Sequence, residues 1–203
     1  MSHDPAYRKT ERTHSGNNKV TALNKLQAAV LVFLFERLAF EDEINTLDFS
    51  LVGDFCGKYF GAFADIPNEQ FEEVAKVAFT LPTYTDSVFL AVTHSKEQDV
   101  IRILANIEDY EREHSRELNL GEVVLLPKFQ IEGDESIHAV LLLRTAIHKV
   151  LNTIPDRQII GGREIKFALV VPLTKAESDY RNKFGHDALM DKLQGQEKDI
   201  YFY

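Results

Sequence analysis

Apolar residues recur at helical spacing near the beginning of the chain. The positions separated by three or four residues are Leu23, Leu26, Val30, Phe33, Leu34 and Leu38. This periodicity predicts a buried helix, for which Thr21 is available as the N-cap. The segment is also rich in Val and Phe, so the pattern leaves open a buried strand inside it. The stretch from Phe40 to Ala64 mixes glycines with aromatic residues and receives no assignment.

A second helix is predicted to begin near Pro67, because proline suits the first turn of a helix. It would end before Leu81-Pro82. Its apolar face would contain Phe71, Val74, Ala75 and Ala78.

A strand and a long helix are predicted next. Ser87 to Thr93 is apolar and rich in β-branched residues, which is typical of a strand. Ser95 and Gln98 have the spacing of a capping box. The helix that follows would bury Val100, Ile101, Leu104 and Ile107, and the pattern allows it to extend through Leu118.

The second half of the chain reads mainly as strands. Val123–Leu126, Ile137–Arg144 and Ile165–Val171 are predicted strands, and a Gly161-Gly162 turn leads into the last of them. Helices followed by strands favour the α+β class, with a mixed β-sheet and flanking helices. We expect a flexible arm over residues 1–20 and a single domain over residues 21–203.

The stretch VVPLTKAESDYRNKFGHDALMDKL predicts a strand followed by two helices. Pro172 should end the strand, since proline cannot donate to the ladder. Thr174 and Glu177 form a capping box for a helix through Tyr180 and Lys183. Gly185 suits the left-handed position after that helix. His186 or Asp187 would cap a second helix, which packs back through Ala188, Leu189 and Leu193.

This arrangement resembles the C-terminal signature of the suppressor-of-fused (SUFU) family. That signature has an apolar strand running into Pro-Leu, then a Glu, an aromatic residue, and a Gly before a helix with Ala-Leu. The matching positions, together with the cap Thr174, are Phe167–Val171, Pro172, Leu173, Glu177, Tyr180, Gly185, Ala188 and Leu189. The preceding IHAVLLLR is similar to the family's penultimate strand, and the resemblance covers roughly the last third of the chain.

The resemblance implies a SUFU-like α+β domain that holds other proteins and performs no catalysis. The animal namesake of the family restrains a transcription factor, and bacterial relatives look like immunity proteins encoded beside polymorphic toxins. In that case the motif residues would be structural, and the partner-binding surface would lie elsewhere.

The charge and the apolar pattern restrict the partners. The chain has 23 Lys and Arg against 32 Asp and Glu, a formal charge of -9, which opposes binding to nucleic acid or to anionic lipid. A basic protein, such as a toxin domain, would be favoured. No apolar run reaches the roughly 20 residues of a membrane span, and no secretory signal is evident. With one cysteine, Cys56, the cytoplasm is the expected location.

Candidate chemistry is sparse. The seven histidines show no metal-binding spacing, Gly161-Gly162 lacks the pattern of a phosphate loop, and no motif marks Cys56 as a nucleophile. We therefore expect no cofactor, no metal and no catalytic residue. A metal-dependent hydrolase built from His94, His138, His148 and nearby acids remains an alternative.

Three acidic clusters and the C-terminus are candidates for protein contacts. Glu41–Glu43, the Glu69/Glu72/Glu73 face and Glu108–Glu117 could offer a negative surface or could be ordinary solvated faces. The terminal KDIYFY is expected to dock as an edge strand. The leading hypothesis is an immunity protein that neutralises a cognate toxin, and the alternative is a general regulatory interaction module of SUFU type.

Overall fold

The structure is a computed structural model that describes residues 23–38, 49–55, 59–66, 75–94, 97–126, 137–195 and 201–202. The predicted N-terminal arm, Cys56 and the first two acidic clusters lie outside these ranges. Ser95 and the side chain of Gln98, which form the predicted capping box, also lie outside the described residues.

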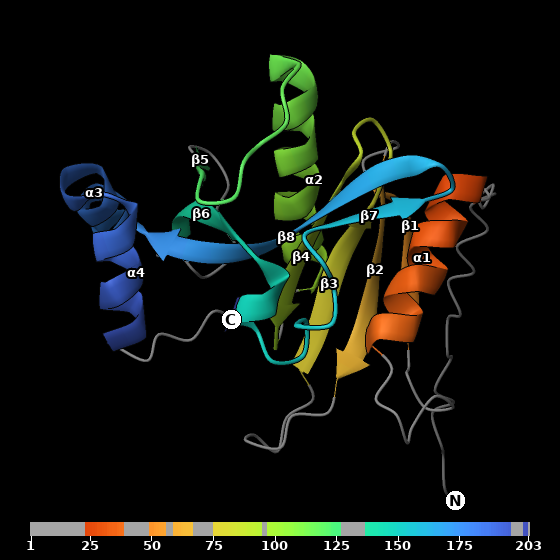
Figure 1. The fold of residues 1–203 in the computed structure, drawn as a ribbon, viewed down its shortest axis with the longest axis horizontal. Coiled ribbons are helices and arrows are strands. Elements are labelled where there is room, and N and C mark those ends of the chain that lie inside the picture. The colour runs from red at the N-terminus through yellow and green to blue at the C-terminus, as the bar shows by residue number, and fades with distance from the viewer. Residues whose placement is uncertain are drawn as a thin grey trace, which may run out of the picture.

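Nine strands of the described residues form one mixed sheet (Figure 1). They are β1 (Phe49–Phe55), β2 (Tyr59–Ile66), β3 (Ala75–Leu81), β4 (Ser87–Thr93), β5 (Val123–Leu125), β6 (Ile137–Leu143), β7 (Arg157–Ile160), β8 (Arg163–Thr174) and β9 (Tyr201–Phe202). The order is β1-β2-β3-β4-β8-β6-β5, with β7 on β8 and β9 on β4. The pairs β4–β8 and β4–β9 are parallel, and the other pairs are antiparallel. The predicted mixed sheet of an α+β domain is confirmed.

Helices cover both faces of this sheet. They are α1 (Lys25–Leu38), α2 (Glu97–His114), α3 (Lys175–Phe184) and α4 (His186–Gly195), with a short 3-10 turn, η1 (Thr145–Ile147). Successive strand residues point to opposite faces. Val88 and Leu90 of β4 therefore pack in one core with α1 and α4, whereas Phe89 and Ala91 pack in the other core with α2.

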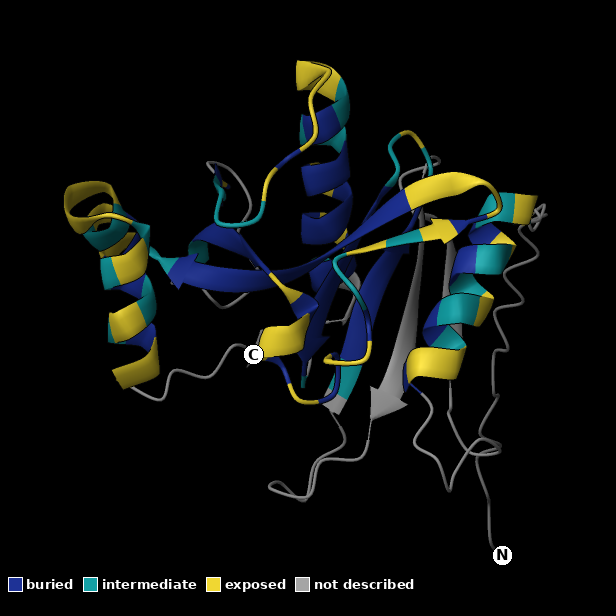
Figure 2. Cartoon of the chain, viewed as in Figure 1, coloured by how far each residue is buried: buried dark blue, intermediate teal, exposed yellow. Residues whose placement is uncertain are grey.

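The central strands are buried on both faces (Figure 2). All seven residues of β4 are buried, and in β8 burial is continuous from Ile165 to Leu173. This explains why both segments consist mainly of apolar residues and do not alternate between apolar and polar ones. The predicted strand over Ile165–Val171 is confirmed and lies within β8.

The first predicted helix is present, but Thr21 is not its cap. The helix α1 begins at Lys25. The Asn24 side chain accepts a hydrogen bond from Gln27 N at 2.9 Å, and Gln27 Oε1 accepts one from Asn24 N at 3.0 Å. Asn24 and Gln27 thus satisfy each other's backbone amides in a capping box, so this helix does not need Thr21 as its cap.

The helix predicted toward Leu81 is wrong for the part that the structure describes. Residues 75–81 form β3, and Pro67 to Val74 lie outside the described ranges. Val77 and Phe79 belong to the core of α1, while Ala78 belongs to the core of α2. A strand buried on both faces has apolar residues at every spacing, including helical ones, so periodicity gave the wrong period.

The order of elements also differs from the expectation, although the fold class is correct. Four strands, β1 to β4, precede α2, so helices do not come before strands. The prediction of α2 is confirmed, and Val100, Ile101, Leu104 and Ile107 are fully buried. The predicted hairpin turn is present, with φ of 59° at Gly161 and 83° at Gly162. The two described residues of the terminal aromatic segment dock beside β4.

Strand β8 continues through Pro172, contrary to the prediction that proline ends it. Pro172 lies opposite Val140 of β6. Two residues further along β6, Leu142 donates its N–H to the carbonyl of Glu122, and the Leu142 carbonyl accepts from the N–H of Gly121. Both groups of Leu142 therefore point away from β8. Val140 faces the same way as Leu142, so Val140 and Pro172 form a non-hydrogen-bonded pair. No ladder bond to β6 requires the missing N–H.

Within the described parts of the chain, every helix is too short or too polar to cross a bilayer.

Candidate functional site

The residues of the predicted C-terminal motif lie together where β8 leads into α3 and α4. Thr174 N donates to Glu177 Oε2 at 2.8 Å, and Glu177 N donates to Thr174 Oγ1 at 3.3 Å. Gly185 follows α3 with φ of 93°, and Leu189 of α4 is fully buried, as is Leu173 at the end of β8. These contacts are those of a capped strand–helix–helix unit. Their standing as a family motif stays a prediction.

Tyr180 belongs to the same unit. Its ring packs in a tilted arrangement against that of Phe184 with centroids 4.6 Å apart, and Lys192 Nζ of α4 lies 4.4 Å from the Tyr180 centroid. The contact with Phe184 lies within α3, the contact with Lys192 joins α3 to α4, and together they give Tyr180 a packing role.

The histidines proposed for a metal-dependent hydrolase are not gathered into a site. His94 follows β4, His138 lies in β6, and His148 is buried after η1. Among the described residues, no three His, Cys, Asp or Glu side chains meet in a way that could hold a metal ion. Burial lowers the pKa of His148, with a smaller contribution from the neighbouring charge of Lys149.

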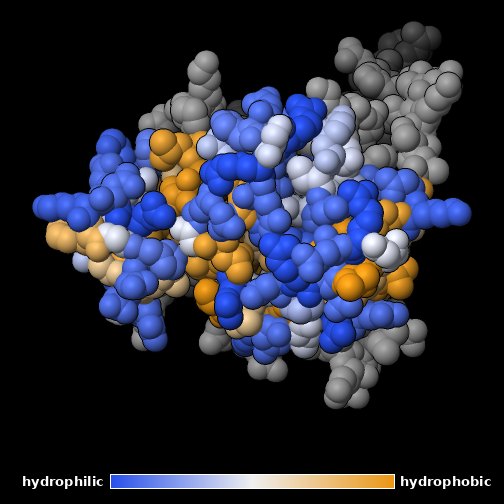
Figure 3. Space-filling view, turned by 45° about the horizontal axis from the view of Figure 1, so that its top comes forward, coloured by the Kyte–Doolittle hydropathy of each residue, from blue (hydrophilic) through white to orange (hydrophobic). Residues whose placement is uncertain are grey.

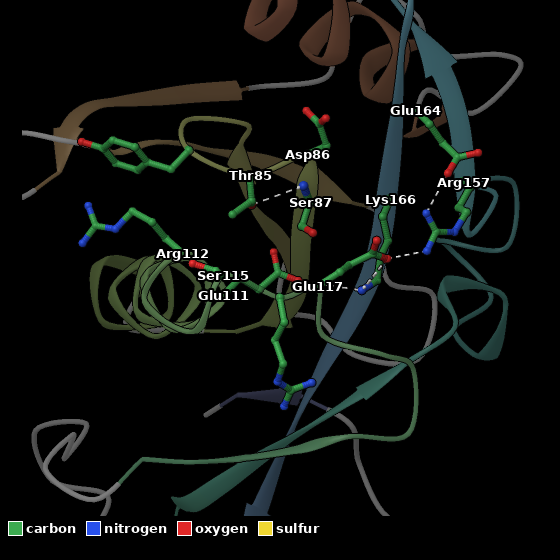
Figure 4. Close-up of a pocket in the computed structure, with 12 residues that line it drawn as sticks. Thr85, Asp86, Ser87, Glu111, Arg112, Ser115, Glu117, Arg157, Glu164 and Lys166 are labelled. Atoms are coloured by element: carbon green, nitrogen blue, oxygen red, sulfur yellow. Dashed lines mark hydrogen bonds and ion pairs between the residues drawn. The ribbon is translucent and has the colours of Figure 1, made fainter.

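Charged residues do converge in another place, which we call the charged cleft (Figure 4). It has a volume of about 310 Å3. Its lining comes from the loop before β4, the C-terminal end of α2 with the segment after it, and the hairpin β7–β8. The lining residues are Tyr84, Thr85, Asp86, Ser87, Glu111, Arg112, Ser115, Arg116, Glu117, Arg157, Glu164 and Lys166.

A buried ion pair forms one wall of the charged cleft. The Lys166 side chain is 6% exposed and the Glu111 side chain 2%. Lys166 lies on the face of β8 that α2 covers, since its neighbours Ile165 and Phe167 point to the opposite core. Its Nζ is 3.9 Å from Glu111 Oε1, which also accepts a hydrogen bond from Leu118 N at 2.8 Å. Because both side chains are almost completely buried, each charge is stabilised by the other and not by bulk water.

Exposed ion pairs form the rim. Glu117 is 44% exposed, and its Oε1 lies 3.3 Å from Lys166 Nζ. Arg157 donates to both Glu117 and Glu164, the latter at 2.8 Å (Figure 4). These two carboxylates, Glu164 first, raise the pKa of Arg157. Glu117 thus joins a buried cation to an exposed one.

The acidic cluster predicted at Glu108–Glu117 is only partly a surface. Glu108 is fully buried, and its Oε1 accepts hydrogen bonds from the amides of Thr83, Tyr84 and Thr85 at 2.9, 2.8 and 3.4 Å. Burial raises the pKa of Glu108 although these amides lower it. Glu108 and Glu111 point into the protein, so these two residues belong neither to a negative surface nor to a solvated face.

Ser87 and Lys166, which both line the charged cleft, do not form a nucleophile–base pair. Ser87 of β4 lies beside Lys166 of β8 in the parallel ladder. A serine nucleophile needs a hydrogen-bonded base, but Lys166 Nζ makes no hydrogen bond within the described chain. Its contacts are instead with the carboxylates of Glu111 and Glu117.

Sequence reasoning missed this cleft, although two signals were present. Lys166 interrupts the apolar run IKFALVV, and a lysine inside a buried strand requires an anionic partner. Glu108 and Glu111 continue the inward helical spacing set by Leu104 and Ile107. A periodicity that includes polar residues would have placed both glutamates on the buried face.

On the face shown in Figure 3, hydrophilic side chains predominate and hydrophobic ones form small separate groups. Single large apolar side chains are exposed at Val32, Leu125, Ile159 and Phe184, for example. Scattered apolar residues of this kind are normal on soluble proteins.

Comparison with known proteins identifies the fold. No protein-family model matches the chain, and neither does any curated protein. A crystal structure of a SUFU homologue from Neisseria gonorrhoeae matches 87% of this chain and 93% of its own, with a TM-score of 0.63 and 16% identity.

Two further structures agree. The Sufu–Fu complex matches 86% of this chain and 85% of its own, with a TM-score of 0.62 and 9% identity. Drosophila Suppressor of Fused matches 86% of this chain but 47% of its own, with a TM-score of 0.60 and 9% identity. The likeness extends well beyond the last third of the chain, where the sequence resemblance lies. The chain therefore has a SUFU-like fold.

Proposed function

We propose that this chain is a non-enzymatic domain that binds another protein. The observation that carries this proposal is the SUFU-like fold over 87% of the chain, since one structure with this fold is a complex of Sufu with Fu. Fold likeness is an analogy, so the binding itself needs a direct test. The cytoplasm is the location that we propose for it.

The finer proposal is an immunity protein that binds and neutralises a cognate toxin. The resemblance of the C-terminal motif supports this role, and the formal charge of -9 favours a basic partner. The full chain should co-purify with the product of a neighbouring toxin gene and protect cells that express it. Capture of a protein that is not toxic, without protection, would favour the regulatory module of SUFU type instead.

The affinity should respond to salt if the acidic charge guides binding, because screening weakens contacts between exposed charges. Charge reversals would locate the contact. Glu164→Lys alters the rim of the charged cleft, whereas Asp191→Lys makes the same charge change on α4. A larger loss of affinity in Glu164→Lys places the contact at the cleft, and equal losses place it elsewhere. If the full chain captures no protein partner and protects no cell, the proposed function is wrong.

A further inference from the structure

Glu117 holds a position that a carboxylate from another molecule could take. It lies three residues beyond the end of α2 at His114, in a segment without regular structure. Ser115 in that segment has φ of 48°, a conformation that is uncommon for residues other than glycine. The Glu117 carboxylate is close to Lys166 and Arg157 at once, so a single exposed side chain serves both cations.

Lys166 has capacity for an additional acceptor. An ammonium group has three N–H donors. Lys166 Nζ is buried and lines the charged cleft, yet it makes no hydrogen bond within the described chain and contacts Glu117 and Glu111 only at ion-pair distances of 3.3 and 3.9 Å. Burying a charge without hydrogen bonds costs free energy. A ligand oxygen that bonds directly to this ammonium would recover part of that cost.

Glu111 and Glu117 differ in their freedom to leave. Glu111 is fixed, because its side chain is buried and holds the amide of Leu118. Glu117 is 44% exposed, and within the described chain its carboxylate pairs with the two cations, Lys166 and Arg157. If Glu117 swings out, Lys166 and Arg157 both face the charged cleft with one fewer anion between them.

We propose that the charged cleft binds a carboxylate group from outside the chain, in the position between Lys166 and Arg157 that Glu117 occupies. The charges support replacement over addition. The lining of the charged cleft has as many carboxylates as cations, with Asp86, Glu111, Glu117 and Glu164 against Arg112, Arg116, Arg157 and Lys166, so a further anion finds no net positive charge unless one carboxylate leaves. Glu117 thereby acts as a built-in competitor. This inference goes beyond the proposed function and does not depend on it.

Removing the competitor is the direct test. Glutarate is titrated into the wild type, Glu117→Ala and Glu117→Gln, and binding is followed by calorimetry and by amide chemical shifts near residues 115–118 and 157–166. Both variants should bind at least about tenfold more tightly, because apparent affinity falls with the fraction of molecules in which the site is open. Glu113→Ala removes an exposed acid of α2 that does not line the charged cleft. It should bind like the wild type.

A second change in the Glu117→Ala background tests the two cations. Arg157→Gln should reverse the gain, and because Arg157 is about half exposed, this variant is expected to fold. Lys166→Met should abolish binding. If that variant does not fold because Glu111 loses its partner, Arg157→Gln alone decides.

Two further titrations test whether the ligand must carry a negative charge and whether a protein side chain can supply the carboxylate. Glutaramide, the neutral counterpart of glutarate, should not bind. The peptide acetyl-Gly-Glu-Gly-amide, compared with its Gln counterpart, asks whether a protein side chain can supply the carboxylate in place of a free acid. The proposal is overturned if Glu117→Ala binds glutarate no more tightly than the wild type, if Arg157→Gln leaves the gain intact, or if glutaramide binds equally well.

Discussion

Replacing Glu108 by alanine should release the loop before β4. Glu108 Oε1 accepts two hydrogen bonds, from Thr83 N at 2.9 Å and from Tyr84 N at 2.8 Å, and a longer one from Thr85 N at 3.4 Å. This single carboxylate therefore fixes three consecutive amides against α2. Glu108→Ala removes the acceptor and leaves a cavity in a side-chain site that is fully buried.

The magnitude follows from the donors that lose their partner. A buried donor without an acceptor costs about 1–3 kcal/mol. The loop residues Thr83 and Thr85 are partly exposed and Tyr84 is exposed, so water can reach their amides and the lower end applies to each. Two strong bonds and one weak bond then give a loss of roughly 2–4 kcal/mol in the free energy of unfolding.

Urea unfolding followed by far-UV circular dichroism measures this loss, because the chain has no tryptophan. Hydrogen exchange provides the specific readout, since the amides of residues 83–85 should lose protection before those of β4. Glu113→Ala, an exposed acid on the same helix, is the matched control. If Glu108→Ala unfolds within about 0.5 kcal/mol of the control, the range of an ordinary surface substitution, and keeps its amide protection, the structural role of Glu108 is refuted.

Glu108→Gln tests the same site through pH. Burial raises the folded-state pKa of Glu108 above its ordinary value of 4.5, so the folded chain binds this proton more tightly than the unfolded chain does. The contribution to stability is therefore fully present below pH 4.5 and is lost as pH rises through the folded-state pKa. Glutamine stays neutral. Its variant should gain stability relative to the wild type as pH increases from 4.5 to 8, and a constant difference would contradict the raised pKa.

Three further changes have defined outcomes. Thr174→Ala should lower the free energy of unfolding by about 1 kcal/mol through loss of the helix cap, measured by urea unfolding, whereas Thr174→Ser should not. Leu104→Ala should cost about 2–5 kcal/mol because it opens a cavity under α2, and a smaller loss would mean that the core collapses around it. Arg116 lowers the pKa of Glu122 to about 2, so that pair stabilises the fold above the ordinary pKa of 4.5 and loses its effect as pH falls toward 2. Arg116→Gln should remove this part of the acid sensitivity, as pH-dependent unfolding would show.

The sequence predicted best those elements whose local signals agreed with their burial. Strand β4 was predicted at its observed bounds, and α3 was predicted from the Thr174–Glu177 capping box. In α2 the apolar spacing and the buried positions coincide. Strand β3 was not predicted because residues on both of its faces are apolar. A strand that is buried on both faces shows no alternation of apolar and polar residues.

The charged cleft was less predictable than the fold because it depends on tertiary contacts. Lys166 and Glu111 are far apart in the sequence and meet because α2 covers one face of β8. Arg157 reaches Glu117 because the hairpin β7–β8 brings it there. The amino-acid composition gives only the total number of charged residues and does not show which of them pair. Their pairing appears only once the register of β8 against β4 and β7 is known.

The division between core and cleft also explains how this fold can be shared at 16% identity. The sheet has helices on both faces, and its core positions require apolar side chains of suitable volume, which many sequences can provide. Partner choice depends on exposed charges, where one substitution can repel the wrong protein. In this chain such charges gather where α2 ends beside β8, and the buried pair beneath them fixes their geometry. A structure with the same fold but without an equivalent of Lys166 should therefore not bind glutarate even with alanine at the position of Glu117, however closely its backbone superposes.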